Sequence, residues 1–433
     1  MTIRYVKKAL KNTQTDSADT FERVSTMLNE LEHGREEAAK GFAAELDGWT
    51  EEIVVPHATI DSAVNSLAES VRDDLRYAHD RVRDFATAQR DAMHEFEVQL
   101  RDGLVAGQRI VPVTTAGCYV PGGRYAHAAS AIMSVATARV AGVQNVIAAT
   151  PANAKNEEVG GIHPAILCAL DLAGCDTILA LGGVQGVAAL AYGLFTDHPA
   201  DIIVGPGNRF VAEAKRILFG RVGIDVFAGP TETMVIADGD ADPEIVAADL
   251  VGQAEHGVDS PVWLITTSNE VAAAVEERVP TLIAELPMDA GEVAARAWRD
   301  FGEIILVDSR EEACAVSDEY ASEHLHVQAA DLDWWLANLR NYGSLFLGEE
   351  TTVAFGDKCS GPNHILPTKG AARYTGGLNV NKFVKQLSYQ RMTRDAVHEV
   401  GPVAARISRL EGMEAHARTA DVRLRKYFPN EKW

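Results

Sequence analysis

The 433-residue sequence contains few cysteines and has a deficit of positive charge. Its five cysteines form no CxxC pair and no regular spacing, which favours a reducing compartment over secretion and argues against a zinc site built from thiolates. Against 40 Lys and Arg residues stand 62 Asp and Glu residues, a formal net charge of -22. Such a protein repels phosphate backbones and anionic lipids, so we expect it to bind neither nucleic acid nor a membrane surface.

Targeting signals and long apolar runs are also lacking. No apolar stretch follows the lysines near the N-terminus, so we expect no signal peptide and a cytoplasmic location. Residues 178–195 approach the length of a membrane span, but four glycines interrupt them. A buried strand, loop and helix of an α/β protein would have the same hydropathy, and we favour that interpretation.

The pattern of apolar residues changes along the chain. From about Asp16 to Asp102 the sequence is charged, poor in glycine and apolar at helical spacing, which predicts a helical lead-in. After Gly107, short apolar runs that mostly end in glycine or proline alternate with alanine-rich helical patterns. Strands that alternate with helices indicate parallel sheets with crossover helices, so the predicted fold class is α/β.

This pattern divides the chain into four parts. Residues 1–110 form the helical lead-in, which joins a first α/β lobe at 111–238, and a second α/β lobe follows at 239–385. The tail, 386–433, is predicted to be helical and lacks a core of its own. We therefore expect the tail to dock on its own body or on a neighbouring subunit.

Two clusters in the second lobe combine residues that suit catalysis or metal binding. Gln253 and His256 are three apart at the end of a helix predicted to start near Pro243, so they can form a two-point clasp for a cation. Residues of these types near a helix C-terminus more often cap carbonyl groups. Glu323 and His324 offer a water-activating base beside a proton acceptor, and the alternative is a solvated polar turn.

Two further clusters lie nearer the C-terminus. Residues 356–368 form a loop rich in glycine and proline, whose polar side chains suit a site, although a surface turn gives the same pattern. The polar residues of this loop are Asp357, Lys358, Asn363 and His364. Glu411 and His416 are five apart, close to but not on one face of a helix, and carry no signal by themselves.

Glycine-rich turns follow two predicted strands of the first lobe. They read LGGVQG at 181–186 and GPGN at 205–208, and neither is GxGxxG, so the standard dinucleotide fingerprint is absent. The second turn opens the predicted helix RFVAEAKRILFG, whose N-terminus can still bind a phosphate.

Six segments, taken in order, resemble the signature segments of histidinol dehydrogenases. They are YVPGG at 119–123, GPGNRFVAEAKRILFGRVGIDVFAGPTE at 205–232, QAEH at 253–256, SEHL at 322–325, GPNHILPT at 361–368 and EGMEAH at 411–416. The resemblance implies a homodimer with two Rossmann-like lobes per chain, a tail exchanged between subunits, one zinc ion per subunit and NAD as cofactor. It implies oxidation of an alcohol through an aldehyde to a carboxylate.

The resemblance also implies roles for individual residues. The zinc ligands would be Gln253, His256, Asp357 and His416, the last from the partner subunit; these are oxygen and nitrogen ligands that suit zinc. Glu323 and His324 would form the acid/base pair. The NAD contacts would be Tyr119, Gln185 and Asn208. The substrate pocket would include Thr231, His364 and Glu411.

Departures from the family pattern bear on the substrate. Arg124 and His127 stand where histidinol dehydrogenases have small or apolar residues, Thr231 replaces a pocket serine, and Lys358 replaces a tyrosine. Gained cations imply an anionic alcohol such as a sulfonate or carboxylate. The pattern resembles the sulfopropanediol dehydrogenase branch, which oxidises 2,3-dihydroxypropane-1-sulfonate to sulfolactate. Histidinol oxidation is the main alternative, and oxidation of another polyol or amino alcohol is a further one. A catalytically inactive member that binds metal or acts as a scaffold is an alternative of a different class.

Overall fold

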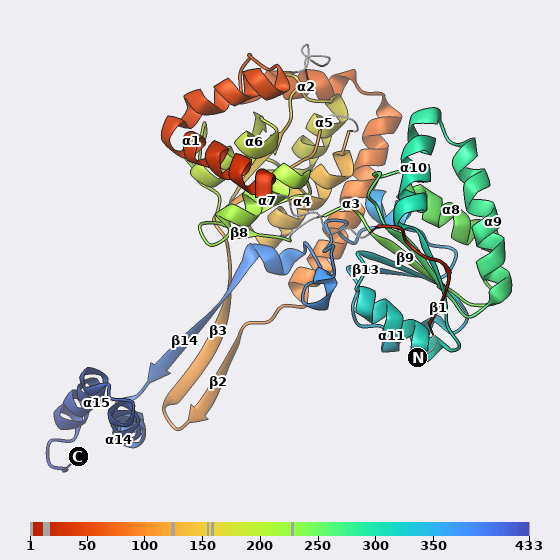
Figure 1. The fold of residues 1–433 in the computed structure, drawn as a ribbon. Helices are drawn as coiled ribbons and strands as arrows, with labels where there is room; N and C mark the ends of the chain where they lie inside the picture. The colour runs from red at the N-terminus through yellow and green to blue at the C-terminus, as the bar shows by residue number, and fades with distance from the viewer. Residues whose placement is uncertain are drawn as a thin grey trace. The chain divides into compact units, whose positions relative to one another are not determined.

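The computed structural model describes residues 3–11, 18–122, 126–153, 156, 160–226 and 229–432. The chain divides into two compact units. The first comprises Met1–Arg90 and Val113–Phe383, and the second comprises Asp91–Pro112 and Val384–Trp433. The first unit contains both predicted lobes, each built around a sheet that is wholly or mostly parallel (Figure 1). This confirms the α/β fold class.

The first lobe has a five-stranded parallel sheet in the order β6-β5-β4-β7-β8. Its strands are β4 (Thr115–Tyr119), β5 (Asn145–Thr150), β6 (Thr177–Ala180), β7 (Ile202–Val204) and β8 (Gly223–Ile224). Because the strand order reverses between β4 and β7, the carboxyl ends of these two strands form a topological switch point, where ligands of such sheets usually bind.

Helices surround this first sheet. They are α1 (Ala18–Phe42), α2 (His57–Ser66), α3 (Glu69–Asp91), α4 (Ala128–Ala141), α5 (Pro164–Ala173), α6 (Gly183–Tyr192) and α7 (Arg209–Leu218). Helix α1 packs on α6 and α7, and α2 packs on α5. The apolar run 178–195 forms β6, a glycine turn and α6, as the sequence predicted.

The second lobe has a six-stranded sheet in the order β1-β11-β10-β9-β12-β13. Its strands are β1 (Arg4–Lys7), β9 (Thr233–Ala237), β10 (Val262–Thr266), β11 (Glu303–Leu306), β12 (His324–Gln328) and β13 (Ser344–Leu347). Only β1 at the edge runs antiparallel to its neighbour in this part of the chain. The first strand of the chain therefore belongs to the second lobe.

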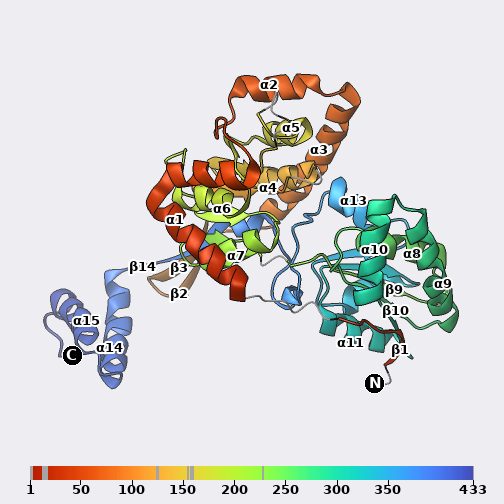
Figure 2. The same cartoon turned by 45° about the horizontal axis from the view of Figure 1, so that its top comes forward.

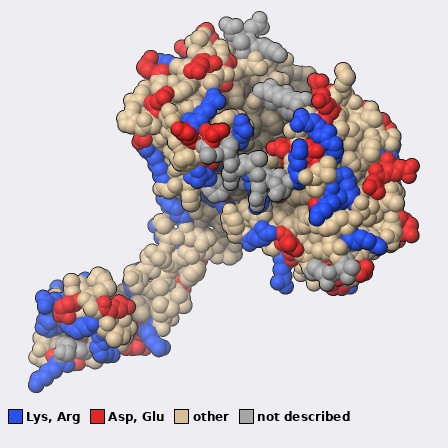
Figure 3. Space-filling view, in the orientation of Figure 1, with Lys and Arg blue, Asp and Glu red and all other residues tan. Residues whose placement is uncertain are grey.

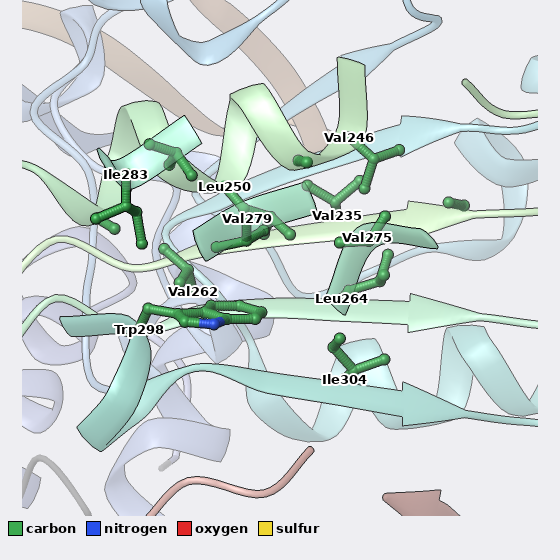
Figure 4. Packing of buried hydrophobic residues seen from close by; sticks show 14 of the residues in the cluster. Val235, Val246, Leu250, Val262, Leu264, Val275, Val279, Ile283, Trp298 and Ile304 are labelled. Atoms are coloured by element: carbon green, nitrogen blue, oxygen red, sulfur yellow. The ribbon is translucent and has the colours of Figure 1, made fainter. Parts of the chain in front are cut away.

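Helices cover both faces of the second sheet (Figures 1 and 2). Helices α8 (Pro243–Ala254), α9 (Asn269–Glu285) and α10 (Met288–Phe301) pack on one face, and α11 (Arg310–Tyr320) and α12 (Leu332–Asn338) pack on the other. Successive strand residues alternate between the faces, so Val235 joins the first cluster and Ile236 the second. Figure 4 shows the first cluster, in which each fully buried aliphatic side chain contributes roughly 1.5–3 kcal/mol.

The second unit combines an antiparallel ribbon with a helix pair. The ribbon has the order β14-β3-β2, from β2 (Phe96–Arg101), β3 (Leu104–Pro112) and β14 (Val384–Met392). Helices α14 (Arg394–Leu410) and α15 (Glu414–Tyr427) pack on each other through small side chains such as Ala405 and Ala417.

The ribbon corrects the prediction in two places. Residues 96–101 and 104–107 were expected in the helical lead-in, and residues 386–392 in a helical tail, but they belong to strands β2, β3 and β14. The first of them, FEVQLR, alternates apolar and polar residues with the period of two that strands require. The helical spacing of the preceding residues conceals this short alternation.

Among the described helices, none has both the length and the apolar composition that a membrane span requires. The face in Figure 3 displays acidic and basic side chains interspersed rather than gathered by sign. The negative net charge is therefore not concentrated in one acidic patch on that face.

A buried ion pair fixes the glycine turn after β7. Lys215 of α7 and Asp225 after β8 are 2% and 3% exposed and are bonded to each other. Lys215 Nζ donates to the carbonyl oxygen of Gly205 (2.9 Å), and Asp225 Oδ2 accepts from the amide of the same glycine (2.7 Å). Both backbone groups of Gly205 are thus held by charged side chains, which determines where the turn lies.

We predict that Lys215→Met lowers the free energy of unfolding by about 3–5 kcal/mol, because Asp225 then stays buried without its counter-charge. Urea unfolding followed by circular dichroism measures the change. The double variant Lys215→Met with Asp225→Leu removes the stranded charge and should recover part of the loss. A single variant as stable as the parent, or less stable by no more than the double variant, contradicts the prediction.

Candidate active site

The residues of the predicted acid/base pair lie at the amino end of the second sheet. Strands β9 and β12 are parallel neighbours with His324 opposite Thr233, so the residues just before each strand are adjacent. The amide of His324 donates to the carbonyl oxygen of Glu232 (3.1 Å). This pairing brings Thr231 and Glu232, on the approach to β9, beside Glu323 and His324.

Glu323 is a buried carboxylate with two donors. Its Oε2 accepts from Thr231 Oγ1 (2.6 Å) and from the Glu232 amide (3.0 Å). Burial raises the pKa of Glu323, and the nearby His324 and these two donors oppose that rise. A carboxyl group with a raised pKa is suited to exchange protons, which is the property of a general acid or base.

His324 lies between two carboxylates. Its Nδ1 is 3.5 Å from Glu323 Oε2, and its Nε2 is 3.5 Å from Asp357 Oδ1. Burial alone would lower the pKa of His324, but the two carboxylates outweigh it and raise the pKa to about 9. The imidazole and its neighbours therefore form a coupled set in which one proton can pass between groups.

Asp357 and His364 come from α13 (Val353–Lys358) and the loop after it. The pKa of Asp357 lies below its usual range, because His324, His364 and Lys358 together outweigh its burial. Burial lowers the pKa of His364 to about 4, so the ring is neutral. We assign its proton to Nδ1, which faces the Asp357 carbonyl oxygen (2.9 Å), and Nε2 then accepts from Ser130 Oγ (2.8 Å).

This loop also borders a pocket and reaches the first lobe. Asp357, Asn363 and His364 line a pocket of about 350 Å³ together with β13 residues such as Phe346. Asn363 Nδ2 donates to the carbonyl oxygen of Met133 in α4 (2.9 Å). We refer to the polar side chains described above as the cluster; they are Thr231, Glu232, Glu323, His324, Asp357 and His364. The loop therefore joins this cluster to helix α4 of the first lobe.

Gln253 lies in the last turn of α8, which ends at Ala254, and His256 lies just after the helix. The side chain of Gln253 is buried, and its Oε1 has no hydrogen-bond partner. The charges of Asp357 and Lys358 act on His256, which places these groups near one another.

The metal prediction fits this part of the structure in one respect. Nowhere in the described parts of the chain do three His, Cys, Asp or Glu side chains converge to hold a metal ion. The unpartnered Gln253 Oε1 is nevertheless an acceptor that a cation would satisfy, and His256 lies near Asp357 of the cluster. Gln253, His256 and Asp357 therefore suit a cation site that another residue completes.

The structure describes two of the three basic residues that the sequence predicts to bind the substrate, His127 and Lys358. Burial lowers the pKa of His127, and the positive charge of Lys358, the last residue of α13, lowers it further, so these two groups are near each other. His127 is the residue that precedes α4. Arg124 lies outside the described residues.

The predicted NAD contacts lie at the switch point of the first sheet. Tyr119, the last residue of β4, accepts from the Gly183 amide through its hydroxyl (2.9 Å). Gly205 follows β7 with φ of +116°, and a Cβ there would lie 1.9 Å from the Tyr119 carbonyl oxygen, so only glycine fits. This close approach places the turn after β7 directly against the end of β4.

Gln185 and Asn208 also belong to this switch point. Gln185 Nε2 donates to Asp47 Oδ2 (2.9 Å), and its buried Oε1 has no partner. Asn208 caps α7, since its Oδ1 accepts from the amides of Phe210 (2.9 Å) and Val211 (3.2 Å). Asn208 thus marks a helix N-terminus, which favours anions such as the phosphates of a dinucleotide.

Two predicted site residues belong to the second unit. Glu411 follows α14, and His416 is the third residue of α15. Both side chains are exposed.

The prediction missed Glu232 of the cluster and Ser130, which is bonded to His364. Burial raises the pKa of Glu232 to about 8, and its Oε2 is buried without a hydrogen-bond partner. Glu232 ends one of the segments that carried the family resemblance, but no spacing rule connects it to Glu323, which is 91 residues away. Ser130 lies in a helix of mostly small and apolar residues with no polar pattern around it, so only the structure reveals its bond to His364.

Comparison with known proteins agrees with the fold. The family model described as histidinol dehydrogenase matches residues 10–424. A solved structure of histidinol dehydrogenase from Elizabethkingia anophelis is 31% identical, with a TM-score of 0.90 over 96% of this chain and 95% of that one. The chain belongs to the histidinol dehydrogenase family.

Two curated relatives are similar over nearly their whole length. A histidinol dehydrogenase homolog from Pelagibacter ubique (strain HTCC1062) is 59% identical over 99% of each chain. A sulfopropanediol 3-dehydrogenase from Ruegeria pomeroyi (strain ATCC 700808 / DSM 15171 / DSS-3) is 52% identical, covering 100% of this chain and 98% of the relative. Relatives of this family thus include one named for an anionic alcohol.

Proposed function

We propose that this protein is a zinc- and NAD-dependent dehydrogenase that oxidises the terminal alcohol of 2,3-dihydroxypropane-1-sulfonate through an aldehyde to sulfolactate. The observation that carries the proposal is the position of Lys358, directly after Asp357 and near His127. A sulfonate is negatively charged at any working pH, so a protein of net charge -22 needs local cations to bind it. The 52% identity to a sulfopropanediol 3-dehydrogenase supports the same substrate.

The alternative is oxidation of histidinol, which carries a positive charge. The family membership and the solved histidinol dehydrogenase structure are compatible with that substrate. The positive charge of Lys358 would repel its ammonium group, so this charge favours the sulfonate.

The residues of the cluster have separate roles in this proposal. The overall reaction is RCH₂OH + H₂O + 2 NAD⁺ → RCOO⁻ + 2 NADH + 3 H⁺, and it needs a proton acceptor at each oxidation. His324 accepts the proton of the alcohol, and Glu323 accepts a proton from the water that adds to the aldehyde. His324 would act as the base in its neutral form, and Asp357 would be one of the residues that hold the cation.

The cation site would be held by Gln253, His256 and Asp357, with His416 of the partner subunit as the fourth ligand. A zinc ion bound there polarises the substrate hydroxyl and lowers its pKa. NAD would lie at the switch point, against Tyr119, Gln185 and the N-terminus of α7 that Asn208 caps.

A homodimer accounts for the surface of the second unit. Phe96 and Leu100 of β2 are each 54% exposed, and Leu410 of α14 is 87% exposed. Large apolar side chains at this exposure on a small unit mark an interaction surface. We propose that a second copy of the chain covers them, and that the tail completes the partner's site.

The substrate assignment predicts that Lys358→Ala raises the Michaelis constant for 2,3-dihydroxypropane-1-sulfonate about 10- to 150-fold, since a charge-assisted contact contributes ~1.5–3 kcal/mol. Arg124→Ala should act in the same direction, with zinc content unchanged in both variants. Lys358→Arg is the matched control, because it keeps the charge. Steady-state NADH formation with this sulfonate and with histidinol checks the assignment, and a clear preference for histidinol overturns it.

The division of roles predicts different defects for the two acid/base residues. Glu323→Gln should still oxidise the alcohol but accumulate the aldehyde, whereas His324→Ala should slow the first oxidation by a factor of ~10² or more. Trapping of the aldehyde with a hydrazine, and assays started from the aldehyde, separate the two steps. Equal losses on alcohol and aldehyde in both variants would refute this division.

The shared site predicts complementation between two inactive proteins. In a hybrid dimer of His256→Ala and His416→Ala chains, one site keeps both histidines, so a one-to-one mixture should regain about a quarter of the parental activity. A mixture of His256→Ala with Gln253→Ala, which damage the same half of the site, is the control. No recovery after confirmed subunit exchange means that each site is built from one chain.

A further inference from the structure

Asp249 of α8 is a partly buried carboxylate with three polar neighbours. Its side chain is 12% exposed. Oδ1 accepts from Thr352 Oγ1 (2.8 Å), and Oδ2 accepts from Gln328 Nε2 (2.7 Å) and lies 3.1 Å from His326 Nδ1. The side chains of His326 and Gln328 are themselves buried. Each oxygen of Asp249 is therefore committed to contacts within the fold.

The three neighbours belong to the elements that carry the cluster. Thr352 is the residue that precedes α13, at whose end Asp357 lies. His326 and Gln328 belong to β12, which begins at His324. Asp249 itself lies one helical turn before Gln253 in α8. One carboxylate thus connects the helix of Gln253, the strand of His324 and the helix of Asp357.

The network continues into the loop between β13 and α13. His326 Nε2 is 2.8 Å from the carbonyl oxygen of Gly348, which has φ of +91° in the turn after β13. The same turn leads to Thr352. The start of α13 is therefore attached to β12 and α8 at two points, Gly348 and Thr352.

None of these bonds involves a residue of the cluster itself. His326 and Gln328 lie farther along β12 than His324, towards its carboxyl end. The network therefore connects α8, β12 and α13 at positions outside the cluster. We propose that Asp249 is a positioning residue that fixes Gln253 relative to Asp357 and thereby sets the affinity of the cation site. The inference rests on the proposed metal site, and it concerns binding of the ion rather than the chemistry that follows.

The test is zinc affinity, measured on the purified full-length protein by competition with a fluorescent chelator. Asp249→Leu removes both acceptors at similar volume and should weaken zinc binding about 10- to 100-fold, as loss of a group that orients metal ligands typically does. Asp249→Asn keeps an oxygen for Gln328 and His326 and an amide for the Thr352 hydroxyl, so it should bind zinc within about threefold of the parent.

The matched control is Asp238→Leu. Asp238 accepts from the amides of Asp240 (2.9 Å) and Ala330 (2.7 Å) after β9, at the opposite end of the same sheet from the cluster. Its loss should lower thermal stability but leave zinc affinity at the parental value. Equal weakening of zinc binding by Asp238→Leu and Asp249→Leu would show a general loss of structure and overturn the proposal.

A milder variant keeps the proposal testable if Asp249→Leu does not fold. Thr352→Val removes only the bond between α13 and Asp249, and should weaken zinc binding about 3- to 10-fold, the effect of one hydrogen bond of ~1 kcal/mol. If the folded variants bind zinc as tightly as the parent, the proposed role of Asp249 is wrong, but the proposed metal site is unaffected. A parent that binds no zinc contradicts the proposed metal site as well, so the two failures are distinguishable.

Discussion

The parallel pairing of β9 with β12 is the constraint on which the cluster depends. It sets Glu232 beside His324 through a backbone hydrogen bond of 3.1 Å, and it gives Glu323 its amide donor and the Thr231 hydroxyl. A slip of one residue would turn the side chains of β12 to the opposite faces of the sheet. Leu325 and Val327 of β12 pack in the second hydrophobic cluster, and a slip would put polar side chains of this strand in their place. The hydrophobic core therefore fixes the positions of the polar groups.

The candidate sites of the two lobes lie at opposite ends of the strands: at the carboxyl ends in the first lobe and at the amino ends in the second. The first lobe offers the carboxyl ends of β4 and β7, which is the usual position for a nucleotide in a parallel sheet. The second lobe offers the amino ends of β9 and β12, where no such rule applies. The bonds of His364 to Ser130 and of Asn363 to Met133 join the two lobes within the first unit. The loop 356–368 thus connects the lobe with the candidate nucleotide site to the cluster that contains the acid/base residues and Asp357.

The sequence predicts the parts of this arrangement that are local. Alternation of apolar runs with helical patterns gives the two parallel sheets, and the glycine turn at 205–208 gives the helix N-terminus. Contacts between strands distant in sequence leave no local pattern, so neither Glu232 nor Asp249 could be identified. The ribbon was missed because its alternation covers only a few residues beside long helices. Gln253 was selected by resemblance and spacing, but its unpartnered oxygen is visible only in the folded chain.

The ribbon of the second unit has a consequence for biosynthesis. Its central strand, β3, pairs with β14 so that Gln108 lies opposite Ser388, although the whole of Val113–Phe383 separates the two segments in the chain. During translation, β3 leaves the ribosome long before its second neighbour exists, and β2 with β3 alone is a hairpin of marginal stability. The first unit therefore has time to fold before the ribbon and the helix pair close. The ribbon can pair completely only after the C-terminal segment has left the ribosome.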